Sequence, residues 1–82
     1  MELTIRFFAA ARAAAGVETA TVVVDDTATL GDLEARLGAL GPELSRVLPR
    51  CSYLCDAIAR CDRATRLGPT RMVDVLPPFA GG

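Results

Sequence analysis

The residues of this sequence that most clearly suggest chemistry are the six at its end, Pro77, Pro78, Phe79, Ala80, Gly81 and Gly82. The two prolines cannot donate backbone hydrogen bonds to a sheet, so a strand that precedes them must stop and the chain must leave it. The two glycines have no side chains, so only backbone and a carboxylate would enter a narrow channel. We therefore predict that residues 77–82 form a protruding tail that inserts into a partner protein.

The α-carboxylate of Gly82 is the reactive group that this tail would deliver. Its reference pKa of about 3.3–3.7 makes it an anion at neutral pH, and hence a poor acyl donor until it is activated. Adenylation with ATP by a separate enzyme would supply a leaving group that a sulfur or amine nucleophile can displace. The alternative is a frayed terminus, but two terminal glycines arise by chance in only about one chain in two hundred.

The rest of the chain offers no catalytic apparatus of its own. It has no His, and all nine of its basic residues are Arg, so it contains no Lys. The His-activated nucleophiles, the Schiff-base lysines and the phosphate-binding lysine loops are therefore excluded. We predict a protein that catalyses nothing alone, binds no cofactor or metal, and relies on an activating partner to use ATP.

Charge and hydrophobicity exclude two further classes of protein. The formal net charge is −1 and neither sign forms a long block, so nucleic-acid binding is not expected. No apolar run approaches the roughly 18–20 residues needed to cross a bilayer, and the first residues do not resemble a signal peptide. The sequence predicts a cytoplasmic protein that forms one domain over residues 1–82.

Three cysteines, Cys51, Cys55 and Cys61, lie close together in the sequence. With no His to complete a mixed-ligand site, a zinc centre would lack its fourth ligand. We interpret the cysteines as reduced thiols that fill space on or near strands. A redox or sulfur-relay role is the alternative, and it would need an electropositive setting supplied by a nearby arginine: Arg50, Arg60 or Arg63.

The elements that must position the tail begin with two strands. Apolar residues alternate with polar ones from Glu2 to Phe8, which predicts a half-buried strand that leaves Phe8 on the outer face. The Ala-rich stretch from Ala9 to Ala15 favours a helical turn ended by Gly16. The β-branched stretch from Thr19 to Asp25 predicts a second strand, antiparallel to the first.

One main helix follows, with Thr29 as its N-cap. Its end is expected near Gly38 or Gly41. An apolar face at helical spacing would pack on the sheet and a polar face would be solvated. The apolar face comprises Leu30, Leu33, Leu37 and Leu40, and the polar face comprises Asp32, Glu34 and Arg36.

The second half of the chain predicts shorter elements. A helical turn over Pro42 to Leu48 would be stopped by Pro49. Short strands are then expected from Ser52 to Cys55 and from Ile58 to Cys61, followed by a loop and a last strand from Arg71 to Leu76. In that last strand, Val73 and Val75 should face the core, while Met72, Asp74 and Leu76 share the outer face.

This order predicts an α+β fold with a mixed sheet on one main helix. If the first and last strands are parallel neighbours at the centre, the helix between them supplies the crossover that parallel strands need. That arrangement is the ubiquitin-like β-grasp.

The chain also resembles the MoaD/ThiS sulfur-carrier family, most closely the branch that contains the small subunit of molybdopterin synthase. The resemblance covers essentially the whole length, and its specific part is the tail. The residues that carry it are Phe7-Phe8-Ala9 with Arg12 near the start, and Val73-Asp74-Val75-Leu76 followed by the Pro-Pro-Phe-Ala-Gly-Gly ending.

The resemblance implies a sequence of partners. An E1-like adenylating enzyme would activate Gly82 and a sulfur-donating enzyme would convert it to a thiocarboxylate. The tail, Pro77 to Gly82, would then thread into the molybdopterin synthase large subunit, and two such transfers would build the dithiolene of molybdopterin. Carried over by motif, Phe8, Arg12 and Leu76 match positions that meet these partners in the family.

Other functions remain open at this point. A carrier for thiazole or cysteine synthesis would look much the same. A ubiquitin-like modifier that forms isopeptide bonds also fits the Gly-Gly ending, although a chain without Lys cannot extend on its own side chains. The remaining alternative is an adaptor domain whose tail takes part in no chemical reaction. The sequence also departs from the family pattern where Asp56-Ala57 replaces a glycine-containing turn, which makes a tight primed turn harder to form.

Overall fold

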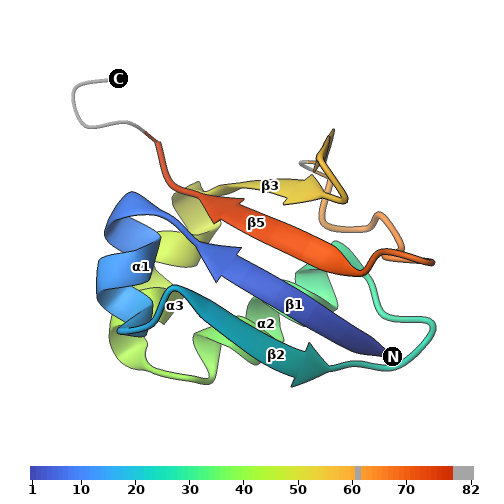
Figure 1. The fold of residues 1–82 in the computed structure, drawn as a ribbon, viewed down its shortest axis with the longest axis horizontal. Helices are drawn as coiled ribbons and strands as arrows, with labels where there is room; N and C mark the ends of the chain where they lie inside the picture. Colours follow the sequence, from blue (N-terminus) through green and yellow to red (C-terminus); the bar gives the residue numbers. More distant parts are fainter. Residues whose placement is uncertain (61, 79–82) are drawn as a thin grey trace.

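The computed structural model describes residues 1–60 and 62–78, within which five strands form one mixed sheet in the order β2-β1-β5-β3-β4 (Figure 1). Strands β1 and β2 are antiparallel, and β1 and β5 are parallel neighbours at the centre. This is the predicted α+β, β-grasp architecture. The elements are β1 (Glu2–Phe7), α1 (Ala9–Ala15), β2 (Thr19–Val23), α2 (Leu30–Gly38), α3 (Pro42–Val47), a 3-10 turn (Leu48–Arg50), β3 (Ser52–Cys55), β4 (Ile58–Arg60) and β5 (Met72–Leu76).

The two central strands bury their inner side chains, as the alternation predicted. Ile5 lies opposite Val73 and Phe7 lies opposite Val75, and all four are at most 3% exposed. Burying each such side chain stabilises the fold by about 1.5–3 kcal/mol relative to leaving it in water. The last strand is therefore held by the core on its inner face, as well as by ladders to β1 and β3 on its two sides.

Helix α2 begins where its capping residues predicted. The Thr29 hydroxyl accepts a hydrogen bond from the Asp32 backbone N–H at 3.2 Å, and the Asp32 carboxylate accepts one from the Thr29 N–H at 2.9 Å, which forms a capping box. Leu30, Leu33 and Leu37 are fully buried. The prediction for Leu40 was wrong: it is 60% exposed, because the helix ends at Gly38 and the chain turns before Leu40.

Two shorter helices complete the layer on this face of the sheet (Figure 1). Helix α1 ends at Gly16 in the left-handed conformation (φ 78°), as predicted. Helix α3 ends at Val47, just before Pro49 as predicted, and a 3-10 turn over Leu48–Arg50, which suits the fixed φ of Pro49, follows it. Across residues 1–60 and 62–78, no helix combines the length and the apolar character needed to cross a bilayer.

The Asp56-Ala57 turn is primed even though it contains no glycine. Asp56 and Ala57 have φ values of 48° and 70°, the left-handed angles that a two-residue hairpin loop requires. Asp56 fits because its carboxylate accepts hydrogen bonds from the backbone N–H groups of Arg71 (3.2 Å) and Met72 (3.0 Å). These hydrogen bonds connect the β3–β4 hairpin to the start of β5. Ala57, with no comparable side-chain hydrogen bond, is the strained residue of the turn.

This strain predicts that Ala57→Gly stabilises the protein. A non-glycine residue in the left-handed region costs roughly 1–2 kcal/mol, and part of this is offset by the greater flexibility of glycine in the unfolded chain. We expect a net gain of about 0.5–1 kcal/mol in the free energy of unfolding, measured by urea denaturation. The matched control is Ala59→Gly in β4, two residues away, which should cost about 0.5–1 kcal/mol. If both substitutions changed the free energy of unfolding equally, the backbone at Ala57 would not be strained.

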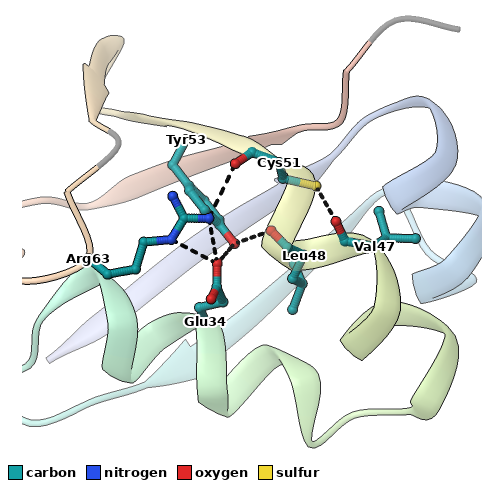
Figure 2. A network of polar contacts seen from close by, with 6 residues as sticks. All are labelled: Glu34, Val47, Leu48, Cys51, Tyr53 and Arg63. Atoms are coloured by element: carbon teal, nitrogen blue, oxygen red, sulfur yellow. Dashed lines mark hydrogen bonds and ion pairs between the residues drawn. The ribbon is translucent and has the colours of Figure 1, made fainter.

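Glu34 does not lie on a solvated helix face, contrary to the prediction. Its Oε2 accepts hydrogen bonds from the Tyr53 hydroxyl (2.7 Å) and from Arg63 Nε (3.1 Å) and Nη2 (2.8 Å), as Figure 2 shows. The Arg63 guanidinium also lies over the Tyr53 ring, 5.1 Å from its centroid. This network, which we call the Glu34 network (Glu34, Tyr53 and Arg63), joins α2, β3 and the loop between β4 and β5.

The Glu34 network makes stability sensitive to high pH. Burial first, and then the hydrogen bond to Glu34, raise the pKa of Tyr53 well above its ordinary value of 10. The neutral form is therefore favoured in the folded state, and the associated stability is present below pH 10 and lost as pH rises above it. From pH 10 to pH 11 we expect the free energy of unfolding of the unaltered protein to decrease by about 1 kcal/mol more than that of the Tyr53→Phe variant. Urea denaturation of both proteins across this range tests the prediction. The same dependence of the free energy of unfolding on pH in both proteins would contradict it.

Candidate functional site

The root of the tail lies where the two parallel central strands end together. Figure 1 shows β1 and β5 pointing the same way, toward α1. Phe7 lies opposite Val75, and the Phe8 backbone N–H donates to the Val75 carbonyl at 3.2 Å, so the parallel pairing extends one residue beyond β1. Two segments far apart in the sequence, the end of β1 and the start of the tail, are thus brought side by side.

The predicted interface residues at this root differ in exposure. Phe8 is 38% exposed, in agreement with its predicted outward position. Leu76 and Pro77 are partly buried, and Pro78 is exposed. The remaining predicted tail residues, Phe79, Ala80, Gly81 and Gly82, lie outside the described residues. What the structure places is therefore the platform from which the tail starts.

An ion pair that the sequence interpretation missed crosses this platform. Arg6 donates from Nε to Asp74 Oδ1 at 2.6 Å and from Nη2 to Oδ2 at 2.7 Å. Asp74 is only 7% exposed, and this hydrogen-bonded pairing raises the pKa of Arg6 above its ordinary value. The same guanidinium lies 5.7 Å from the centroid of the Phe8 ring. The alternation of both strands places Arg6 and Asp74 on the same outer face, but only the register of β1 against β5 makes them partners.

Arg12 lies on the exposed side of α1, close after Phe8. Its backbone N–H donates to the Phe8 carbonyl at 3.3 Å, and its guanidinium is 3.4 Å from Glu18. Both side chains of that pair are more than half exposed, so the interaction contributes little and can be exchanged for another carboxylate. Phe8 and Arg12 border one hollow of about 270 Å³. The structure thus groups Phe8 with Arg12 and, through the strand pairing, with Leu76.

The cysteines that the structure describes are fillers, as predicted. Cys51 and Cys55 are free thiols, 4% and 7% exposed, and burial raises the pKa of both above the ordinary thiol value. Cys51 also donates a hydrogen bond from its thiol to the Val47 carbonyl at 3.3 Å (Figure 2). A raised pKa opposes the thiolate that redox or relay chemistry requires. Cys61 lies outside the described residues.

The charged groups around the tail root are paired. Over residues 1–60 and 62–78, no three Cys, Asp or Glu side chains gather in a way that could hold a metal ion. The polar groups near the tail root, namely Arg6, Asp74, Arg12 and Glu18, are paired with one another. Of the two pairs, only Arg6–Asp74 joins the two central strands by short hydrogen bonds to a buried carboxylate.

Comparison with known proteins agrees with this geometry. The ThiS family model matches residues 5–82. Small archaeal modifier protein 3 of Haloferax volcanii is 38% identical over 92 aligned positions, which cover the whole of both chains. The crystal structure of SAMP1 from Haloferax volcanii superimposes over the whole of both chains with a TM-score of 0.84 and 27% identity.

A third similar structure is a complex of subunits 1 and 2 of molybdopterin-converting factor from Helicobacter pylori. It covers the whole of both compared chains with a TM-score of 0.72 and 23% identity, so the likeness concerns the fold. The family match extends over nearly the whole chain, includes the tail, and agrees with the β-grasp topology and with the placement of the tail root. The chain belongs to the ThiS family, within the ThiS/MoaD sulfur carriers.

Proposed function

We propose that this protein is the sulfur-carrying small subunit of molybdopterin synthase, with the carboxylate of Gly82 as the group that carries the sulfur. The observation that carries the proposal is the combination of a family match that runs to residue 82 with a tail that starts from a rigid two-strand root. Because the prolines at 77 and 78 direct the chain out of the sheet, the carboxylate can be presented at a distance from the domain.

The chemistry takes place in two activating steps. A carboxylate oxygen of Gly82 attacks the α-phosphorus of ATP on an E1-like adenylating enzyme, and pyrophosphate leaves. A persulfide sulfur of a sulfur-donating enzyme then attacks the acyl carbon and displaces AMP, and a thiol cleaves the resulting acyl disulfide to release the thiocarboxylate. The role of the chain is to present the acyl group, while the partners supply the catalytic side chains. Because the first step consumes ATP and the second consumes the sulfur of a persulfide, we place them in the cytoplasm.

The acceptor in this proposal is the molybdopterin synthase large subunit. The similar Helicobacter pylori structure is a complex of subunits 1 and 2, which supports a pairing of the same kind here. Phe8, Arg12 and Leu76 would contact the partner while residues 77–82 occupy its pocket. Phe8 and Leu76 supply apolar area next to the tail, and Arg12 can exchange its weak pair with Glu18 for a partner carboxylate.

Intact-mass analysis tests the proposal directly. Protein isolated from cells that contain the biosynthetic enzymes should include a fraction in which one oxygen is replaced by sulfur, and tandem fragmentation should locate the exchange at Gly82. When this fraction is mixed with the large subunit and the cyclic pyranopterin precursor, molybdopterin should form as the sulfur is lost. Loss of the sulfur without molybdopterin would contradict the assigned acceptor, and absence of the sulfur species would contradict the carrier role.

A second candidate function is covalent modification of proteins. The 38% identity to small archaeal modifier protein 3 favours it, because an adenylated glycine can be attacked by a lysine amine as well as by sulfur. This function predicts that lysines of other proteins carry residues 72–82 of this chain after digestion with trypsin, because Arg71 is the last site at which trypsin can cut. The chain itself has no Lys, so each target lysine should carry a single copy. Thiazole and cysteine synthesis remain distinguishable by the acceptor enzyme that copurifies.

A further inference from the structure

A groove on the helix side of the tail root has no role in the function described so far. It has a volume of about 650 Å³ and lies between α1, α3 and the first tail residues. Its apolar part comes from small or rigid side chains that leave the groove open. The residues that line it are Ala9, Ala10, Glu43, Arg46, Val47, Arg50, Pro77 and Pro78.

The charge of this groove is positive. Arg46 lies 3.5 Å from Glu43, but both side chains are more than 70% exposed, so the pair is weak. Arg50 is exposed at the end of the 3-10 turn, and within residues 1–60 and 62–78 no carboxylate is recorded at salt-bridge distance from it. Two guanidinium groups thus border an apolar groove that contains one carboxylate. This arrangement complements an apolar side chain accompanied by a negative charge.

The groove is continuous with the tail, because Pro77 and Pro78 belong to both. Gly82 is four residues beyond Pro78. Fully extended, these four residues reach about 13 Å at roughly 3.3 Å per residue. An enzyme that acts on the carboxylate of Gly82 must therefore bring its surface close to Pro78, and with it to the groove. The short reach of the tail thus forces a partner that binds its end to cover its root as well.

From this charge and this continuity we infer that the groove docks a segment of the E1-like adenylating enzyme in which an acidic residue adjoins an apolar one. The apolar side chain packs on Ala10, Val47 and the prolines, and the carboxylate pairs with Arg46 and Arg50. This inference rests on the proposed function and adds to it a second contact next to the hollow at Phe8 and Arg12, since Ala9 lines both. It assigns to the groove the task of binding the carrier in the activating step.

The test is ATP–pyrophosphate exchange by the purified adenylating enzyme of the same organism, measured against carrier concentration. For the double variant Arg46→Glu with Arg50→Glu we expect KM for the carrier to rise about tenfold or more with kcat nearly unchanged, because binding is weakened before any chemistry occurs. Raising the salt concentration should increase KM of the unaltered protein and have a smaller effect on the variant. The control Arg66→Glu with Arg71→Glu has the same change of charge outside the groove, and its KM should stay within about twofold.

A second pair of variants tests the apolar part of the groove. Ala10→Phe fills it from the exposed side of α1, and Ala64→Phe adds the same bulk to the exposed loop before β5. Only the first should raise KM. Circular dichroism and urea denaturation should show that all variants remain folded.

The outcomes separate the two proposals. If the unaltered protein supports exchange but the groove variants match their controls, docking in the groove is wrong and the carrier function stands. If KM of the arginine variant falls, the groove holds the carboxylate of the chain's own tail, and docking of the enzyme is again wrong. If the unaltered protein supports no exchange, the proposed function fails and the inference fails with it.

Discussion

Deletion of Gly82 is expected to lower sulfur loading at least a hundredfold while leaving the domain folded. The shortened chain still ends in a glycine carboxylate, but that group stops about 3.3 Å short of its position in the active site of the adenylating enzyme. Misplacement of a reacting group by as little as 1 Å can cost about a hundredfold in rate. The fraction of protein that carries one sulfur in place of oxygen, measured by intact mass after reaction with the activating enzymes, gives the result.

Two further variants distinguish the effect of the length of the tail from the effect of the size of its side chains. Gly81→Trp keeps the length but adds a bulky side chain to a segment that must pass through a channel, and it should fail like the deletion. Ala80→Gly keeps the length and removes bulk, and it should be loaded within about threefold of the unaltered rate. Thermal unfolding should be the same for all three. Normal loading of the Gly82 deletion would end the proposal that this terminus is the working group.

Replacement of Glu34 by alanine is expected to cost about 1.5–3 kcal/mol in the free energy of unfolding, the range for hydrogen bonds that involve a charged group. It removes the shared acceptor of Tyr53 and Arg63, which leaves a buried hydroxyl and a two-thirds-buried guanidinium without their carboxylate. For a domain of this size such a loss lowers Tm by roughly 4–8 °C for each kcal/mol.

Glu43→Ala is the matched control for this effect. Glu43 also lies on a helix and is also close to an arginine, but both partners of its pair are largely exposed. Its replacement should change the free energy of unfolding by less than about 0.5 kcal/mol. Urea denaturation of both variants at neutral pH gives the comparison. Similar costs at the two positions would show that the Glu34 network contributes no more than an ordinary surface pair.

Most of the fold could be predicted because local signals and tertiary packing agree along much of this chain. Alternating residues in β1 and β5 fixed which side chains enter the core, and Thr29 fixed the start of α2. The ends of elements were less certain, because Leu40 follows the helical spacing but lies beyond the glycine at which the helix stops. The spacing alone does not show whether Gly38 or Gly41 ends the helix.

The Glu34 network and the Arg6–Asp74 pair could not be read from local patterns. A glutamate on the polar side of a helix is usually solvated, and only the position of the loop that carries Arg63 makes Glu34 a shared acceptor. Arg6 and Asp74 are 68 positions apart and meet only when the register of β1 against β5 is known. The motif at the tail, in contrast, depends on neither packing nor register, and it could be recognised from the residues alone.

The central position of β5 has a mechanical consequence for the proposed binding of the tail by a partner. Because the strand is paired along its length on both sides, a pull on Pro77 acts parallel to β5 and across both ladders. The hydrogen bonds of β5 to β1 and β3 must then break together, whereas a strand pulled away from the edge of a sheet loses its hydrogen bonds one at a time. In the proposed function, the pairing of β5 on both sides would therefore keep the domain folded when a partner pulls on its tail.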